Sequence, residues 1–168
     1  MSDTIAQHKA EGPRSISCAV ITVSDTRTLE TDRGGPVVCE LLEQAGNQVA
    51  HREIVKDEPD EMKSLIQRLI DDGCQVILMT GGTGITSRDQ TFETVSGLFT
   101  KSLPGYGELF RVLSYEEIGS AAMLSRATAG VIDKTVLLTM PGSPAAVRLA
   151  MEKLILPELS HLVQQASK

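Results

Sequence analysis

Residues 76–89 place a short apolar run directly before a cluster of glycines, and this stretch constrains the fold more than any other. Residues 76–79 have the composition of a strand that is buried on both faces. The cluster has three glycines within four positions: Gly81, Gly82 and Gly84. The chain must leave the sheet there, because a strand or helix interior does not tolerate that density of glycine. A helical pattern resumes after Asp89, and a strand, a glycine turn and a helix together predict an anion-binding site.

The polar side chains around these glycines have the chemistry to bind a polyphosphate together with a metal ion. Thr80 and Thr83 offer hydroxyls, Arg88 offers a guanidinium group and Asp89 offers a carboxylate. The spacing matches neither the Walker A motif nor the dinucleotide-binding fingerprint. A glycine-rich turn that binds no ligand is the alternative interpretation.

Strand-like and helix-like segments alternate along the first part of the chain. The expected elements are a strand at 18–23, a helix at 34–45, a strand at 48–55, a helix at 59–72, a strand at 76–79 and a helix after 89. This order predicts a parallel sheet with helices on both faces. The strand at 48–55 alternates less cleanly and is expected near an edge.

The second part of the chain is expected to complete one domain. Residues 103–125 are predicted to be helical with breaks, and two strand-like runs follow at 129–132 and 135–140. Ser143 is a plausible N-cap of a long final helix that begins at Pro144. We therefore expect a flexible tail at 1–14 and a single domain at 15–168.

Composition excludes several classes of partner. The net charge of −6 argues against general nucleic-acid or membrane-surface binding. No apolar run reaches the ~18 residues of a membrane span, and a cytoplasmic protein is expected. Cys18, Cys39 and Cys74 form no C-x-x-C pair, so buried thiols in a reducing compartment are expected.

Four polar turns follow the predicted strands, and ligands of open α/β sheets bind at the carboxyl ends of strands. These turns are Ser24-Asp25, Asp57-Glu58, Thr80 to Asp89, and Pro141-Gly142-Ser143. Asp57 and Asp89 are the natural pair for Mg²⁺, which one or two carboxylates and substrate phosphates commonly hold. For each of these turns, the alternative interpretation is a solvated surface loop that binds no ligand. No nucleophile–base pair stands out, which suits a reaction achieved by positioning and charge neutralisation.

Five segments together carry a family resemblance: Thr22-Val-Ser-Asp25, Thr80-Gly-Gly-Thr-Gly84, Arg88-Asp89, Leu124-Ser-Arg126 and Met140-Pro-Gly-Ser143. In this combination the chain resembles the MogA/MoaB family of molybdopterin adenylyltransferases, which act in molybdenum cofactor biosynthesis. Residues 110–119 and 140–143 are more similar to the MoaB branch.

The resemblance implies a three-layer α/β/α fold with a mostly parallel sheet, assembled as a homo-trimer or homo-hexamer. It implies a reaction between molybdopterin and ATP that needs Mg²⁺ and releases pyrophosphate, with Asp57 and Asp89 as the catalytic, metal-associated carboxylates. Other molybdenum cofactor biosynthesis proteins are the implied partners. The candidate substrate and nucleotide contacts are Ser24, Asp25, Thr80, Gly81, Gly82, Thr83, Gly84, Arg88, Ser125, Arg126, Pro141, Gly142 and Ser143.

Two departures from the family pattern keep a second interpretation open. Gln90-Thr91-Phe92 follows Asp89, where active members often have Val-Thr-Pro. Arg33-Gly34-Gly35 follows Asp32, where a Ser-Gly pair is frequent. The alternative is a non-catalytic molybdopterin-binding protein of the same fold, and a remote third interpretation is an unrelated nucleotide-binding regulator.

Overall fold

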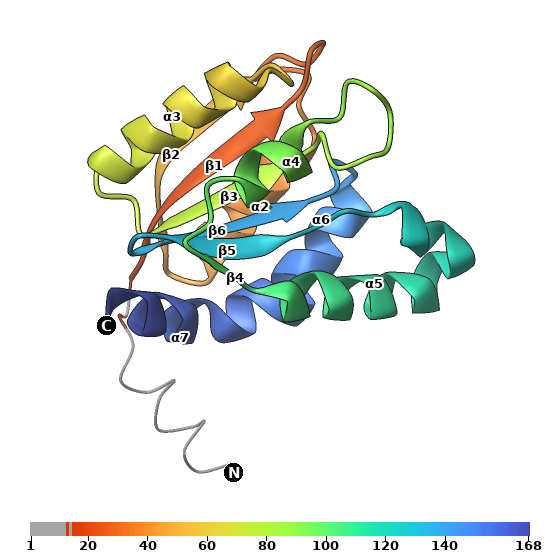
Figure 1. The fold of residues 1–168 in the computed structure, drawn as a ribbon. Helices are drawn as coiled ribbons and strands as arrows, with labels where there is room; N and C mark the ends of the chain where they lie inside the picture. Colours follow the sequence, from red (N-terminus) through yellow and green to blue (C-terminus); the bar gives the residue numbers. More distant parts are fainter. Residues whose placement is uncertain (1–12, 14) are drawn as a thin grey trace.

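The computed structural model describes residue 13 and residues 15–168, so most of the tail expected at 1–14 lies outside the described residues. Six strands form one sheet in the order β2-β1-β3-β6-β5-β4 (Figure 1). The strands are β1 (Ser17–Val23), β2 (Gln48–Val55), β3 (Val76–Thr80), β4 (Lys101–Ser102), β5 (Ala129–Ile132) and β6 (Thr135–Met140). The helices are α2 (Gly34–Gln44), α3 (Pro59–Asp71), α4 (Thr91–Ser96), α5 (Pro104–Ile118), the 3₁₀ helix η1 (Gly119–Leu124), α6 (Pro144–Ala150), the π-helical turn η2 (Met151–Ile155) and α7 (Leu156–Ser167).

Four strands of the sheet are parallel, which confirms the mostly parallel arrangement. Val20 of β1 lies beside Leu78 of β3, and Leu78 lies beside Leu138 of β6. β2 forms one edge, as its weaker alternation predicted. β5 and β6 form an antiparallel hairpin that turns at Asp133, whose φ is 53°. The short edge strand β4 pairs with β5 and was not predicted, because it consists of two exposed residues.

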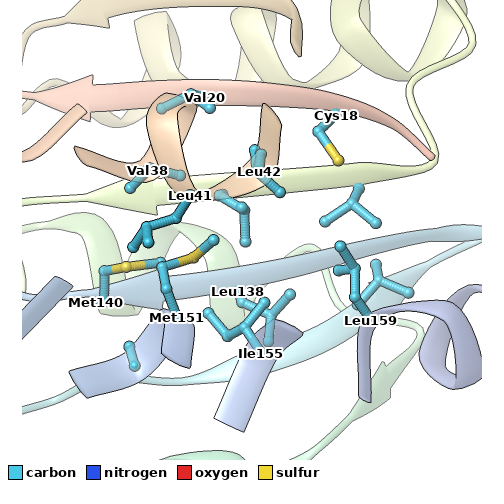
Figure 2. Packing of buried hydrophobic residues seen from close by; sticks show 14 of the residues in the cluster. Cys18, Val20, Val38, Leu41, Leu42, Leu138, Met140, Met151, Ile155 and Leu159 are labelled. Atoms are coloured by element: carbon cyan, nitrogen blue, oxygen red, sulfur yellow. The ribbon is translucent and has the colours of Figure 1, made fainter. Parts of the chain in front are cut away.

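Helices cover both faces of the sheet, which confirms the three-layer α/β/α fold. One hydrophobic core packs α2, α5, α6, η2 and α7 against the first face, and part of it is shown in Figure 2. Val38 and Leu42 of α2 are fully buried in this core, whereas Ala45, which the helical spacing placed beside them, is exposed beyond the helix end. A second core packs α3 and α4 against the opposite face.

The carboxyl ends of β1, β2, β3 and β6 meet at one edge of the fold, where the loop from β3 to α4 projects (Figure 1). The chain leaves β3 through Gly81 and Gly82, whose φ values are 96° and 62°. Both values lie in the region that favours glycine. Among the described helices, none combines the length and the apolar character needed to cross a membrane.

Candidate functional site

Asp25 joins the loops that follow β1, β2 and β3. Its Oδ1 atom accepts a hydrogen bond from the backbone N–H of Asp57 at 3.2 Å. The guanidinium of Arg88 donates to both carboxylate oxygens of Asp25 at 3.0 Å and to Glu58 at 2.9 Å. The hydrogen bonds from Arg88 lower the pKa of Asp25. The predicted convergence of three polar turns is therefore present, and Arg88 is engaged by two carboxylates.

Asp57 is buried beneath the glycine turn. Its Oδ1 atom accepts the backbone N–H of Gln90 at 2.9 Å, while its Oδ2 atom faces Gly82, where a Cβ would lie only 2.6 Å away. Burial raises the pKa of Asp57, and the charges of Asp89 and Asp25 raise it further, against the opposing effect of the Gln90 N–H. Oδ2 of Asp57 accepts no hydrogen bond from the described residues.

Asp89 lies at the far end of the same loop. Its Oδ2 atom accepts the backbone N–H of Thr86 at 2.8 Å and the Thr86 hydroxyl at 2.6 Å. Burial acts to raise the pKa of Asp89, but the hydrogen bonds from Thr86 and Gly84 and the charge of Arg126 outweigh it, so the pKa is lowered. Asp89 is therefore ionised at neutral pH.

The glycine turn lets three backbones approach one another closely. A Cβ at Gly81 would collide with the Val23 carbonyl, and the N–H of Gly81 donates to the Met140 carbonyl at 3.1 Å. The Gly81 amide is thus used within the fold. Within the part of the chain that the structure describes, the N–H groups of Gly82 and Thr83 donate to no protein acceptor. These two amides are the ones left to bind an anion.

Two pockets flank the contact between the β3 and β6 ends, and Gly81 and Gly142 line both. The first, which we call the glycine pocket, has a volume of about 360 Å³. It is lined by Gly81, Gly82, Thr83, Gly84, Asp89, Leu124, Ser125, Pro141 and Gly142. These nine residues come from three segments of the chain. They include the carboxylate of Asp89 and the unpaired amides of Gly82 and Thr83.

The second pocket, which we call the arginine pocket, has a volume of about 440 Å³. It is lined by Thr22, Val23, Ser24, Arg27, Asp32, Arg33, Thr80, Gly81, Gly142, Ser143 and Pro144. Ser143 also caps α6, since its hydroxyl accepts the backbone N–H of Ala146 at 3.2 Å, as predicted. Two guanidinium groups and several hydroxyls make this pocket suited to an anionic ligand.

Sequence reasoning missed Thr22, Arg27, Asp32 and Arg33 as candidate site residues. Asp32 is buried, and its carboxylate accepts the Thr22 hydroxyl at 2.8 Å and the N–H groups of Gly34 and Gly35 at 3.1 and 3.2 Å. It therefore caps α2 and holds the wall of the arginine pocket. An aspartate two residues before a predicted helix was the available signal.

Four of the predicted site residues line neither pocket: Asp25, Asp57, Arg88 and Arg126. Asp57 supports the glycine turn from below, and Asp25 and Arg88 connect the loops. The guanidinium of Arg126 points to α4, where it pairs with Glu93 and lies 5.4 Å from the Phe92 ring centroid. Ser125, its neighbour, does line the glycine pocket.

The donor set fits a magnesium ion that takes most of its ligands from solvent and substrate. Across residues 15–168, no cluster of three or more His, Cys, Asp or Glu side chains is placed to hold a metal. Asp57 and Asp89 are near enough for the charge of Asp89 to raise the Asp57 pKa. One or two carboxylates with substrate phosphates are the usual magnesium environment in phosphoryl-transfer sites.

The chain matches the family model described as "Probable molybdopterin binding domain" over residues 19–161. It is 52% identical to molybdenum cofactor biosynthesis protein B of Bacillus subtilis, with 98% of each chain covered. It is 48% identical to the protein of the same name from Staphylococcus aureus, with 92% of this chain and 94% of that chain covered.

Solved structures show the same likeness. A crystal structure of molybdenum cofactor biosynthesis protein B superposes with a TM-score of 0.89 at 49% identity, covering 94% of this chain and 99% of that chain. The tungsten cofactor synthesizing protein MoaB from Pyrococcus furiosus superposes with a TM-score of 0.84 at 38% identity, covering 93% and 99%. A MogA structure superposes with a TM-score of 0.82 at 28% identity, covering 89% and 99%.

Proposed function

Because the chain belongs to the molybdopterin-binding family of molybdenum cofactor biosynthesis proteins that includes MoaB and MogA, we propose that it adenylylates molybdopterin with Mg-ATP. The observation that carries the proposal is the arrangement of Asp57 and Asp89 around one glycine turn. Asp89 lies in the glycine pocket beside the unpaired amides of Gly82 and Thr83, and Asp57 presents an unpaired oxygen behind Gly82.

The reaction is a phosphoryl-group substitution. An oxygen of the terminal phosphate of molybdopterin attacks the α-phosphorus of ATP, and the bond from that phosphorus to the oxygen bridging to the β-phosphate breaks. Pyrophosphate leaves with the electron pair, and the product is adenylylated molybdopterin. No protein nucleophile is needed, which agrees with a site that consists of amides, carboxylates and arginines.

Each part of the site then has a role in binding. Asp57 and Asp89 would hold Mg²⁺, whose chemistry is to neutralise the negative charge on the phosphates. The amides of Gly82 and Thr83 bind an anionic oxygen in the glycine pocket. Arg27 and Arg33 attract the second anionic group into the arginine pocket.

The proposal is tested by measuring pyrophosphate release with molybdopterin, ATP and Mg²⁺ present together, and with each omitted in turn. Release that requires all three components supports the adenylyltransferase. Equal release without molybdopterin would indicate ATP hydrolysis at some other site and would overturn the assignment.

A non-catalytic molybdopterin-binding protein of the same fold is the second candidate function. The observation that favours it is the engagement of Arg88, whose guanidinium is bound to Asp25 and Glu58 and is not free for a phosphate. This candidate predicts molybdopterin binding by titration calorimetry with no measurable Mg-ATP binding. Micromolar Mg-ATP binding would contradict it.

We also propose a homo-oligomer, either a trimer or a hexamer. An apolar surface on α5 and η1, which we call the α5 patch, consists of Leu109, Val112, Tyr115, Ile118, Met123 and Leu124. Each of these side chains is more than 50% exposed. Exposed apolar patches of this kind mark contact surfaces. The hollow of about 530 Å³ in this surface is lined by one basic and one acidic side chain, Arg111 and Glu116, among apolar ones, and a second copy of the chain would present groups of both signs to them.

A further inference from the structure

The peptide bond between Asp89 and Gln90 is held from both sides. Its carbonyl oxygen, which belongs to Asp89, accepts a hydrogen bond from Nη2 of Arg126 at 3.0 Å. Its N–H group, which belongs to Gln90, donates to Oδ1 of Asp57 at 2.9 Å. This peptide group therefore links Asp89 to Asp57, and two side chains hold it in place.

The guanidinium of Arg126 is itself held by α4. Its Nη1 atom pairs with the carboxylate of Glu93, and its Cζ atom lies over the ring of Phe92, 5.4 Å from the centroid. The backbone N–H of Arg126 donates to the carbonyl of Thr83 at 3.3 Å. Arg126 thus contacts the start of the glycine loop at Thr83, its end at Asp89 and the helix that follows.

The same geometry separates Arg126 from the substrate-binding surfaces. Its side chain is 24% exposed and lines neither the glycine pocket nor the arginine pocket. Its Nε atom is buried and has no partner among the described residues. The contacts that Arg126 makes are with the protein, although the sequence motif suggested a substrate contact.

We propose that Arg126 is a positioning residue that sets the placement of Asp89 relative to Asp57 through the Asp89–Gln90 peptide. Phe92 and Glu93 fix the guanidinium, the guanidinium fixes the carbonyl of Asp89, and Asp57 fixes the adjoining N–H. The kinetic part of this inference rests on the proposed adenylyltransferase activity, whereas the structural part concerns the loop alone.

Arg126→Gln tests this role because it removes the guanidinium, and with it the ion pair to Glu93 and the hydrogen bond to the Asp89 carbonyl, while it keeps a polar side chain at the position.

The test compares Arg126→Gln and Arg126→Lys with a matched control, Arg68→Gln. Arg68 lies on α3, pairs with Glu53 at 2.8 Å and lines neither the glycine pocket nor the arginine pocket, so its loss removes an ion pair of the same type outside the site. The first readout is amide hydrogen exchange at Gln90, which needs no substrate. The second is the pair of kinetic parameters kcat and KM for ATP and molybdopterin.

We expect Arg126→Gln to speed exchange at Gln90 at least 10-fold and to lower kcat at least 10-fold, with both KM values within twofold of wild type. Arg126→Lys, which keeps the charge, should recover at least threefold in kcat over Arg126→Gln. Arg68→Gln should leave Gln90 exchange and kcat unchanged. Raised KM with unchanged kcat would show a substrate contact and would overturn the positioning role.

The two parts of the inference fail separately. If wild-type protein shows no turnover, the proposed activity fails, and Gln90 exchange alone decides the role of Arg126: faster exchange in Arg126→Gln supports it and unchanged exchange overturns it. If Arg126→Gln does not fold, Phe92→Leu takes its place, because it removes only the ring under the guanidinium. Threefold faster exchange at Gln90 in that variant supports the role, and unchanged exchange overturns it.

Discussion

The carboxylate of Asp57 accepts a hydrogen bond from the backbone N–H of Gln90 at 2.9 Å. This bond joins the loop after β2 to the residue that directly follows Asp89. Because the donor is the main-chain N–H of the next residue, Asp57 is linked to Asp89 through one peptide group. The two carboxylates that the proposed reaction requires are therefore held together by the fold before any ligand binds.

Replacement of either carboxylate is expected to abolish adenylylation. Asp89→Asn and Asp57→Asn each remove one negative charge from the proposed magnesium site while keeping the shape of the side chain. We expect pyrophosphate release to fall at least 100-fold in each variant, which corresponds to about 2.7 kcal/mol in the activation free energy. The measurement is the initial rate at saturating ATP and molybdopterin.

Asp133→Asn is the control for both variants. Asp133 is exposed in the β5–β6 turn with a φ of 53°, a conformation that asparagine adopts readily. Its rate should equal that of wild type. Full activity in both site variants would show that neither carboxylate takes part.

Gly82→Ala should disturb the site through the backbone. The φ of 62° at Gly82 disfavours alanine, and the new Cβ would collide with the Thr91 hydroxyl and lie 2.6 Å from Oδ2 of Asp57. We expect the free energy of unfolding to fall by about 1–3 kcal/mol. We also expect the adenylylation rate to fall at least 10-fold. Urea unfolding and the same rate assay measure the two effects.

Gly105→Ala serves as the comparison for Gly82→Ala. Gly105 lies in the first turn of α5, and a Cβ there would have no heavy atom within 4 Å. Alanine favours helix by up to about 1 kcal/mol over glycine, so this variant should be as stable as wild type or slightly more stable. Equal stability of Gly82→Ala and Gly105→Ala would contradict the strain at the glycine turn.

Charges introduced into the α5 patch should dissociate the proposed oligomer. Val112 and Tyr115 lie one turn apart on the exposed face of α5, and both line the hollow there. The double variant Val112→Glu/Tyr115→Glu would bury two unpaired charges at an interface formed by this face. Analytical ultracentrifugation should show a loss of trimer or hexamer and the appearance of monomer.

Leu29→Glu provides the control for the patch, because Leu29 is an exposed apolar residue outside α5 and η1. It should sediment like wild type. If the double variant keeps the wild-type mass, the interface lies elsewhere on the surface.

The Cys18 thiol is expected to make the protein less stable as the pH rises above 9. Burial raises the pKa of Cys18 from 9.0 to about 12, and the nearby Cys74 adds to the shift. Between these values the unfolded chain has released the proton and the folded chain retains it. The folded state binds more protons, so the free energy of unfolding falls with pH, by at most about 1.4 kcal/mol per pH unit from this group.

Urea unfolding at pH 8 and pH 10.5 measures this dependence in wild type and in Cys18→Ala. The variant removes the titrating group, so its stability should decline less over the same interval. Identical declines in the two proteins would show that Cys18 does not ionise on unfolding in this range.

Much of the fold could be predicted, because its elements begin and end at residues with strong local preferences. Pro59 and Pro144 begin α3 and α6 as expected, and Ser143 caps α6 through its hydroxyl. The two strand-like runs on either side of Asp133 and Lys134 form β5 and β6 with the predicted bounds. The pairing of β4 does not follow from local pattern, since it depends on neighbours across the sheet. The antiparallel direction of β5 was not predicted, although the two residues between β5 and β6 are too few for a parallel crossover.

The composition of the site was more predictable than the pairing of its charged groups. Placing polar turns at the carboxyl ends of parallel strands correctly predicted the convergence of Asp25, Asp57 and Asp89. The sequence could not show that Arg88 pairs with Asp25 and Glu58, or that Arg126 pairs with Glu93. Those partners lie 30 or more positions apart, and the chain offers each arginine many acidic side chains.

The measurement that tests the central claim most directly is the mass of the product formed from molybdopterin, ATP and Mg²⁺ by wild type and by Asp89→Asn. We predict a species with the mass of adenylylated molybdopterin, formed with wild type and absent with Asp89→Asn. Unmodified molybdopterin recovered in complex with the wild-type protein, with no adenylylated species, would contradict the claim and would identify a binding protein.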